Sequence, residues 1–270
     1  MIIDFHTHVF PDQLAPKAMA ELSACFGPSY TPAHDGTVAG LIKSMDGANV
    51  DISVIQPVVT KPSRFKKINK WVQNLCFDPS PHSNRIVGFG GIYPHTDTYK
   101  EDINFIIELG LKGLKFHAEY QDFILDEPKM LPIYDYALSQ GLIILHHAGF
   151  DPDFPPPFKS SPQQFANVSN AMKGGIMIAA HFGGWGQWDE VEHHLVGSNI
   201  YLDTSMGFEF FPQEQFVRIV RTHGIDKILF ATDSPWSHAC TEIERLRALP
   251  LSSHEKEAIL GGNAKRILNI

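Results

Sequence analysis

Short runs of apolar, often β-branched residues recur along the chain and alternate with segments of helical spacing. Eight of these runs have the length and composition of buried strands. They cover residues 1–6, 51–59, 85–93, 111–117, 141–147, 175–181, 199–205 and 227–233. Between them, residues 37–49, 97–110 and 213–224 show the apolar spacing of amphipathic helices, and the last two segments end at a glycine.

This alternation predicts the fold. Strands that are apolar on both faces and separated by helices indicate a parallel sheet covered by helices. Eight strand–helix units in about 250 residues match an α/β fold, the (β/α)8 TIM barrel, whose active site lies at the carboxyl ends of the strands. An open doubly wound sheet would usually carry a glycine-rich loop after the first strand, where this chain has DFHTH. Because no linker or low-complexity segment divides the chain, we expect one domain over residues 1–270.

The composition narrows the classes of partner. Of the 270 residues, 43% are hydrophobic and 19% are charged, and the formal net charge is -8. This acidic balance argues against nucleic-acid binding, which requires clustered Lys and Arg. No signal-peptide pattern precedes the first strand and no apolar run approaches the length of a membrane span, so we expect a cytoplasmic protein that binds no membrane. Cys25, Cys76 and Cys240 are few and widely spaced, which predicts free thiols.

The ends of the predicted strands are rich in polar residues, histidines above all. Six of the 14 histidines lie at or just beyond these ends, together with one lysine and two aspartates. The residues are His6, His8, Lys115, His117, His146, His147, His181, Asp203 and Asp233. In a barrel the strand ends converge on one mouth, where gathering so many polar groups is unfavourable unless a ligand offsets it.

The ligand that fits these residue types is a metal ion. His6 and His8 point to the same side if the first strand keeps its period-two geometry. Nitrogen and oxygen ligands without a thiolate suit zinc, with manganese, iron or nickel as alternatives. We therefore expect one divalent metal ion, zinc in the first place, bound by His6, His8, one histidine of the fifth strand and Asp233.

The fifth predicted strand ends in two adjacent histidines, His146 and His147. His147 stands two residues before a glycine, as does His181 at the end of the sixth strand. We interpret this shared spacing as selecting His147 for the metal, with His146 a neighbouring core residue. Asp4 shares the parity of His6, so two interpretations are open: it orients an imidazole, or it makes a structural hydrogen bond lower in the barrel.

Other strand-end residues are candidates for binding the substrate. Lys115 and His117 share a face and could hold an anionic group. Lys115 has two further interpretations, as a buried, paired lysine or, once carbamylated, as the bridge to a second metal. Trp236, shortly beyond the eighth strand, is expected to line the pocket. We interpret Asp203 as a cap of its turn, and the proline-rich stretch 151–158 as a rigid loop at the active site.

Taken in order, these motifs resemble the amidohydrolase superfamily, specifically its amidohydrolase-2 branch, to which aminocarboxymuconate-semialdehyde decarboxylase is related. The matching stretches are DFHTH, GLKFH, GLIILHHAG, AAHFGG, ILFATDSPW and GGNAKRIL. They span nearly the whole chain, and the ordered set is far more specific than any one piece. The resemblance implies the same barrel, a metal held by His6, His8, His147 and Asp233, and His181 close to the metal-bound water.

The resemblance also implies a reaction, the hydrolysis of a small-molecule amide, lactone or related ester. A bound divalent metal lowers the pKa of its water from about 15.7 towards about 7, and Asp233 or His181 accepts the proton and returns it to the leaving group. The branch includes decarboxylases with the same ligands, so a decarboxylase of a small aromatic or enoic acid is the alternative. A ligand-binding barrel without catalysis is a third interpretation.

One absence favours the hydrolase. No strand end carries an unambiguous arginine that would hold a substrate carboxylate, and the nearest candidate, Arg64, is better read as a solvated residue at a helix start. The expected partner is therefore a small molecule, and a homodimer is the default expectation for such a barrel.

Overall fold

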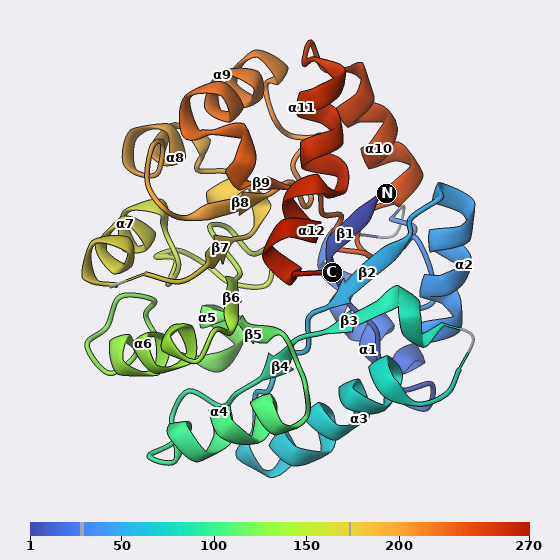
Figure 1. Cartoon of the computed structure of the whole chain (residues 1–270), viewed down its shortest axis with the longest axis vertical. Coiled ribbons are helices and arrows are strands. Elements are labelled where there is room, and N and C mark those ends of the chain that lie inside the picture. The colour runs from blue at the N-terminus through green and yellow to red at the C-terminus, as the bar shows by residue number, and fades with distance from the viewer. Residues whose placement is uncertain (28–29, 81, 173) are drawn as a thin grey trace.

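Parallel strands lie at the centre of the molecule and helices surround them, as the computed structural model shows (Figure 1). It describes residues 1–27, 30–80, 82–172 and 174–270. The strands are β1 (Ile3–Thr7), β2 (Ile52–Ile55), β3 (Ile86–Gly88), β4 (Gly90–Gly91), β5 (Gly113–Phe116), β6 (Ile143–His146), β7 (Met177–Ala179), β8 (Tyr201–Asp203) and β9 (Ile228–Leu229). Each pairs in parallel with its neighbour, in the orders β1-β2-β3 and β4 through β9.

These strands form a (β/α)8 barrel, which confirms the predicted fold class and all eight predicted strands. β3 and β4 fall within one predicted strand and flank Phe89, whose N–H donates to the carbonyl of Ile55 at 3.0 Å. The first and last strands meet through the N–H of Phe5, which donates to the carbonyl of Phe230 at 2.9 Å. A parallel bridge between Thr7 and Ser234 continues this contact.

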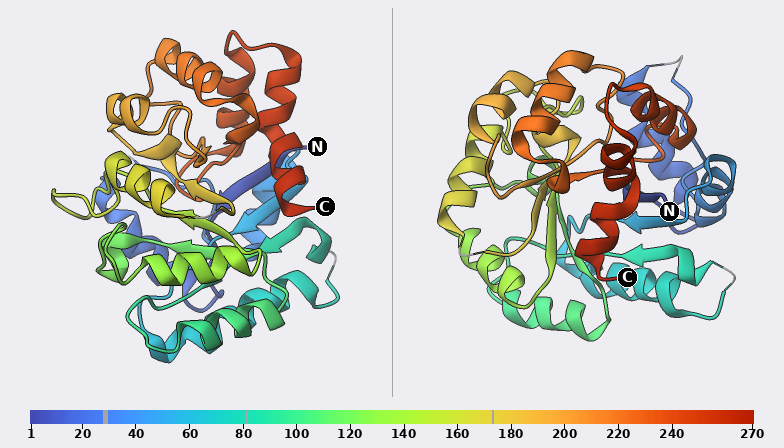
Figure 2. Two further views of the ribbon diagram at one scale, coloured as in Figure 1. Left: turned by 60° about the vertical axis from the view of Figure 1, so that its left-hand side comes forward. Right: turned by 45° about the horizontal axis from the view of Figure 1, so that its top comes forward.

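Helices cover the outside of the barrel, and the two chain ends lie close together at one end of it (Figure 2). The helices are α1 (Ala15–Leu22), α2 (Val38–Ala48), α3 (Phe65–Phe77), α4 (Tyr99–Glu108), α5 (Ala118–Gln121), α6 (Leu131–Ser139), α7 (Pro162–Ala171), α8 (Trp188–His194), α9 (Gln213–His223), α10 (Ala239–Ala248), α11 (Ser253–Glu257) and α12 (Asn263–Leu268). α2, α4 and α9 are the three helices predicted from the sequence. Among the described residues, none of the helices combines the length and apolarity needed to span a membrane.

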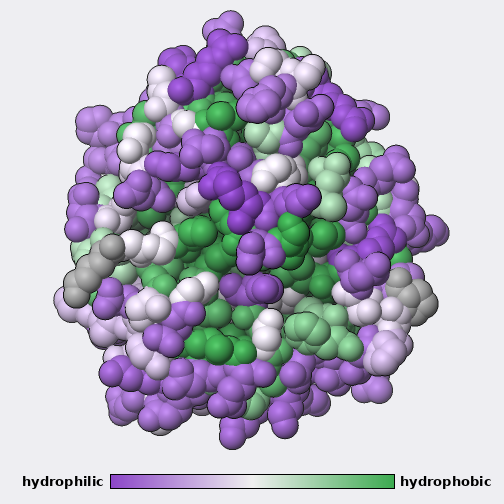
Figure 3. Space-filling model, viewed as in Figure 1, coloured by the Kyte–Doolittle hydropathy of each residue, from purple (hydrophilic) through white to green (hydrophobic). Residues whose placement is uncertain are grey.

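The core has two apolar parts. One cluster fills the barrel interior and includes Ile3, Phe5, Val54, Leu145 and Leu229. The larger cluster lies between the strands and the surrounding helices. On the face that carries the chain ends, apolar side chains gather towards the middle and hydrophilic ones form the periphery (Figure 3). The three cysteines are free thiols, as predicted.

The first strand departs from regular alternation at the point where the site begins. The register of β1 against β2 shifts between Asp4 and Thr7, as a β-bulge produces. Ile3 and Phe5 both pack in the interior cluster, as regular alternation requires, whereas His6, the residue directly after Phe5, lines the same cavity as His8. The parity that groups Asp4 with His6 therefore does not hold, and of the two interpretations of Asp4 the structure shows the structural hydrogen bond.

A buried carboxyl group outside the barrel makes stability depend on pH. The Glu242 side chain on α10 is 2% exposed. One of its oxygens accepts from Arg245 at 2.8 Å, and the other has no hydrogen-bond partner among the described residues. Burial raises the pKa of Glu242 to about 7. In the unfolded chain the Glu242 carboxyl ionises at its ordinary, lower pKa. This group therefore makes folding less favourable as pH rises towards about 7.

Glu242→Gln is therefore expected to stabilise the protein by about 1–2 kcal/mol at pH 8 and to give no gain at pH 4. Urea unfolding of the parent and the variant at both pH values measures this difference in the free energy of unfolding. The contributions of the other titrating groups are the same in both proteins and cancel in the comparison. Glu244→Gln, an exposed position on the same helix, serves as the control. An equal effect of Glu242→Gln at both pH values would contradict the prediction.

Candidate metal centre

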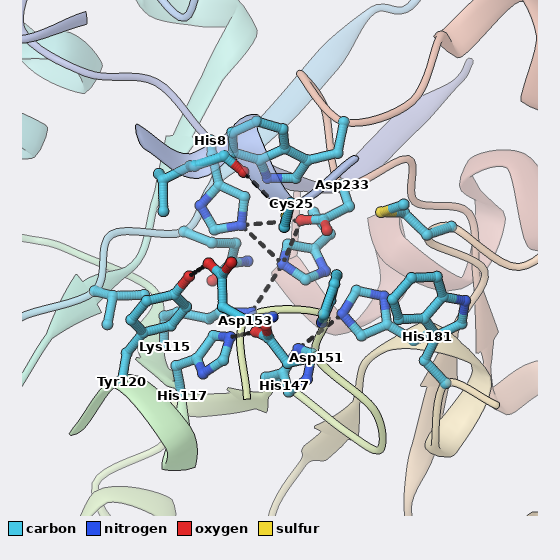
Figure 4. A pocket seen from close by; sticks show the side chains of 18 of the residues that line it. His8, Cys25, Lys115, His117, Tyr120, His147, Asp151, Asp153, His181 and Asp233 are labelled. Atoms are coloured by element: carbon cyan, nitrogen blue, oxygen red, sulfur yellow. Dashed lines mark hydrogen bonds and ion pairs between the residues drawn. The ribbon is translucent and has the colours of Figure 1, made fainter. Parts of the chain in front are cut away.

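Three side chains converge at the floor of a cavity of about 280 Å³ at the carboxyl ends of the strands (Figure 4). His6 and His8 come from β1 and its continuation, and Asp233 follows β9. The Nε2 atoms of the two histidines are 3.1 Å apart. Asp233 Oδ1 lies 3.3 Å from His6 Nε2 and 3.0 Å from His8 Nε2. Three of the four predicted metal ligands therefore form one group.

Asp203 on β8 determines which ring nitrogen of His6 carries the proton. His6 Nδ1 lies 3.1 Å from Asp203 Oδ2, and burial, with Lys115 nearby, holds the pKa of His6 well below its usual value. The neutral ring therefore donates its one proton to Asp203. Its Nε2 lone pair then faces His8 and Asp233, the arrangement of a metal-binding histidine oriented by a carboxylate.

This donor set fits a divalent metal. Burial opposes the ionisation of Asp233, but the neighbouring imidazoles of His6 and His8 outweigh it and lower the pKa of its carboxyl to about 2. An ionised carboxylate and an imidazole lone pair thus share one buried spot. Such acceptors repel one another unless a cation or proton donors lie between them. Among the described residues, the only donor to His6 Nε2 apart from the neighbouring imidazole is Lys115 Nζ, at 2.8 Å.

Lys115 lies on β5 and its residue is 1% exposed. Burial lowers the pKa of its ammonium group to about 8, against the attraction of Asp233 and Asp203. Its amine lines the cavity, where the sequence predicts a substrate-binding lysine, and it also contacts His6 directly. Both the interpretation as a buried, paired lysine and the substrate-binding role are compatible with this position.

His147, the fourth predicted ligand, lies beside His181. Its Nδ1 is 3.0 Å from His181 Nε2, and its Nε2 is 3.2 Å from the carbonyl of Phe150. Burial holds the pKa of His147 well below its usual value, so the neutral ring has one proton. If that proton goes to the Phe150 carbonyl, the Nδ1 lone pair faces His181.

His181 is held by the turn after β8. Its Nδ1 lies 3.0 Å from Ser205 Oγ and 3.3 Å from the Ser205 carbonyl. The Ser205 hydroxyl itself donates to Asp203, so both oxygens accept from His181. The proton of a neutral His181 ring therefore sits on Nδ1, and Nε2 is an acceptor. If the His147 proton goes to the Phe150 carbonyl, two lone pairs face each other 3.0 Å apart, on His147 Nδ1 and His181 Nε2, and this spot attracts a cation or a proton. In the other tautomer, His147 Nδ1 donates to His181 Nε2.

A further group of possible ligands consists of His117, His147 and Asp151. His117 Nε2 lies 3.2 Å from Asp151 Oδ2. The rings of His117 and His147 are stacked at 4.1 Å between centroids, with 11° between their planes. Since imidazole lone pairs lie in the ring plane, two stacked rings direct them side by side and not towards one ion. We interpret His117 as a hydrogen-bonded neighbour of Asp151.

His146 points away from the cavity into the aromatic core. Its ring stacks on Phe116 at 4.8 Å with 12° between the planes, and Tyr134 and Phe165 contact it edge-on. Neither ring nitrogen has a hydrogen-bond partner among the described residues. Its placement agrees with the interpretation of His146 as a core residue.

The strand-end loops hold two site residues in the left-handed region of backbone space. His181 has φ 53° and Asp233 has φ 59°. Such a backbone is unfavourable for residues with a Cβ atom by about 1 kcal/mol or more, so surrounding contacts must stabilise it. One of them is the N–H of Asp233, which donates to the carbonyl of His6 at 2.8 Å. This bond ties the carboxylate to the strand that carries both histidines.

Loop residues form the outer wall of the cavity. Trp236 lines it as predicted, and so do His117, Tyr120, Asp151 and Trp185. The proline-rich stretch thus contributes to the site through its first residues. The sequence did not single out Asp151, because an aspartate before a proline is typical of any turn.

The orienting role of Asp203 can be tested. Asp203→Asn keeps the shape but presents an amide N–H to His6, which moves the imidazole proton to Nε2 and blocks its lone pair. We expect metal affinity to fall about 10- to 100-fold, as measured by competition with a chelating dye. Asp4→Asn is the control: Asp4 accepts from the N–H and hydroxyl of Thr232, so its loss should lower stability and leave metal affinity within about threefold. Equal losses of affinity in both variants would contradict this role.

Comparisons with known proteins agree with this architecture. The family model described as Amidohydrolase matches residues 3–270. A search of curated proteins found no match. Among solved structures, an uncharacterized TIM-barrel protein from Bordetella bronchiseptica is similar at TM-score 0.80 and 18% identity, over 99% of this chain and 98% of that one.

Two similar structures carry names that state an activity. One is a dihydroxybenzoic acid decarboxylase from Polaromonas sp. with bound manganese and the inhibitor 2-nitroresorcinol, at TM-score 0.69 and 15% identity, over 99% of this chain and 96% of that one. The other is a probable 2-pyrone-4,6-dicarboxylic acid hydrolase from Acinetobacter baumannii with citric acid bound, at TM-score 0.67 and 18% identity, over 100% of this chain and 99% of that one. At these identities the likeness shows the fold alone.

Proposed function

Because the chain belongs to the amidohydrolase family, we propose that it is a metal-dependent hydrolase that cleaves an amide, lactone or related ester of a small molecule. The observation that carries the proposal is the convergence of His6, His8 and Asp233 within 3.0–3.3 Å of one another at the floor of the cavity. The probable hydrolase from Acinetobacter baumannii supports this choice as an example of the reaction class on the same fold.

His6, His8 and Asp233 would hold the metal, and we propose His147 as the fourth ligand. Zinc is our first choice on ligand type, and manganese is present in one similar structure. When bound, a divalent metal polarises a substrate carbonyl and lowers the pKa of a water molecule. The residues around it then have to orient the substrate and move one proton.

We assign the proton transfer to His181. Its Nδ1 is bound to Ser205, so Nε2, which lies 3.0 Å from His147 Nδ1, is the atom that accepts a proton and returns it to a leaving group. Asp233, with a pKa of about 2, is a much weaker base and serves better as a ligand. Lys115, beside the metal ligands, is positioned to donate to an oxygen that gains negative charge during attack.

Decarboxylation of a small aromatic or enoic acid is the second candidate, and the name of the Polaromonas enzyme favours it. The lining of the cavity does not, since among the described residues no arginine lines it and Lys115 is its one cation. A carboxylic acid would have to bind through Lys115 and the metal alone.

The function can be tested on purified protein prepared without chelator. We expect about one equivalent of bound transition metal, loss of turnover after chelation and recovery with zinc or manganese. Metal-loaded protein is then assayed against lactones, esters, amides and aromatic acids, following proton release and carbon dioxide together. Carbon dioxide release without hydrolysis would replace the hydrolase with the decarboxylase, and failure to bind any transition metal would remove the site itself.

A further inference from the structure

The cavity wall carries more negative than positive charge. The carboxylates of Asp151, Asp153 and Asp233 line it, and Lys115 is the only lysine or arginine among the described lining residues. Lys159, the nearest lysine along the loop, is paired with Asp122 on the surface. A bound divalent metal would bring the net charge of the cavity close to zero, and a substrate carboxylate would make that net charge negative again.

Two of these carboxylates, Asp151 and Asp153, are not proposed metal ligands and are held in place by hydrogen bonds. Asp151 Oδ1 accepts from the N–H of Asp153 at 2.9 Å, and its Oδ2 faces His117 at 3.2 Å. Asp153 Oδ2 accepts from the hydroxyl of Tyr120 at 2.5 Å. Each carboxylate still has acceptor capacity, so this part of the wall is suited to hydroxyl or amino groups and repels a second carboxylate.

Aromatic side chains provide the apolar part of the wall. Phe26 and Trp236 line the cavity, with their rings stacked at 6.0 Å and 25° between the planes. Tyr30 stacks on Phe26 at 4.6 Å and donates its hydroxyl to the carbonyl of Trp236 at 2.7 Å. The pair is thus fixed before a ligand arrives, and fixed aromatic faces favour a ligand that contains a ring.

We propose that the substrate is an uncharged molecule with an apolar ring, and that it places a hydroxyl or amino group against Asp153 and Asp151. This inference rests on the proposed hydrolase function and specifies its substrate class. Asp153 acts as a specificity residue: it accepts a hydrogen bond from a neutral substituent and opposes an acidic one. Phe26 and Trp236 hold the ring.

Three probes that differ at one position test this proposal: benzamide, 4-hydroxybenzamide and 4-carbamoylbenzoate. Isothermal titration calorimetry on metal-loaded protein gives their Kd values. We expect 4-hydroxybenzamide to bind at least about 10-fold more tightly than 4-carbamoylbenzoate, with benzamide between them. Asp153→Asn, which keeps the size and removes the charge, should narrow this ratio at least about fivefold. Asp78→Asn, an exposed aspartate at the end of α3, should leave the ratio unchanged.

Equal or tighter binding of 4-carbamoylbenzoate to the unaltered protein would overturn the proposal. So would failure of all three probes to bind, or an unchanged ratio in Asp153→Asn. The hydrolase proposal is judged separately by turnover. If the Kd values follow the expected order but no lactone, ester or amide is hydrolysed, the binding preference is supported and the hydrolase proposal is rejected. Hydrolysis with a preference for acidic substrates supports the hydrolase and overturns the binding preference.

Discussion

Replacing Asp233 with asparagine is expected to reduce metal-supported turnover at least about 10³-fold. The carboxylate is the one anionic member of the group with His6 and His8, 3.0 Å from His8 and 3.3 Å from His6. Asparagine keeps the size but removes the charge that attracts a divalent cation. It also tolerates the left-handed backbone at φ 59° better than most residues. The loss should therefore come from the metal site and not from misfolding.

Metal content and turnover, measured on the same preparation, check this prediction. We expect Asp233→Asn to retain the circular dichroism spectrum of the parent and to lose most of its bound metal. Asp189→Asn, an exposed position at the start of α8, is the control and should retain both metal and turnover. Full metal occupancy with turnover within about tenfold of the parent would show that Asp233 is neither a ligand nor essential to the chemistry.

The fold was predictable because its signal repeats. Each strand is a short run of β-branched and apolar residues, and the alternation with helices leaves few architectures open. The same logic brought distant residues together: His6 and Asp233 meet because the first and last strands of the barrel are neighbours. The N–H of Phe5 donates to the carbonyl of Phe230 where these two strands meet.

The orientation of individual side chains was less predictable. Periodicity groups Asp4 with His6, but the register shift in β1 separates them, and such a shift depends on pairing with β2. The orienting carboxylate proved to be Asp203, from a strand almost two hundred residues away. An aspartate followed by Thr and Ser resembles an ordinary turn, and nothing local distinguishes it. Only the three-dimensional structure shows that it also faces His6 Nδ1 at 3.1 Å.

The shared H-x-G spacing of His147 and His181 leads to the second prediction of large effect. The structure places these two rings in contact, 3.0 Å between His147 Nδ1 and His181 Nε2, and buries His146 behind them. We expect His147→Ala to weaken metal binding at least about 100-fold and to lower turnover by at least as much, because it removes the proposed fourth ligand and the partner of His181. His146→Ala should retain its metal.

The two variants should separate in stability as well as in metal binding. His146 stacks on Phe116 and contacts Tyr134, so its removal leaves a cavity in the core and should lower the free energy of unfolding by about 2–4 kcal/mol. Chelator-dye competition and urea unfolding of the chelated proteins measure the two effects independently. Because His147 faces the site, its alanine variant should lose less stability once the metal is absent from both proteins. Equal loss of metal in the two variants would contradict the prediction. It would mean that the H-x-G spacing does not distinguish His147 from His146, and the fourth ligand would have to be sought elsewhere in the cavity.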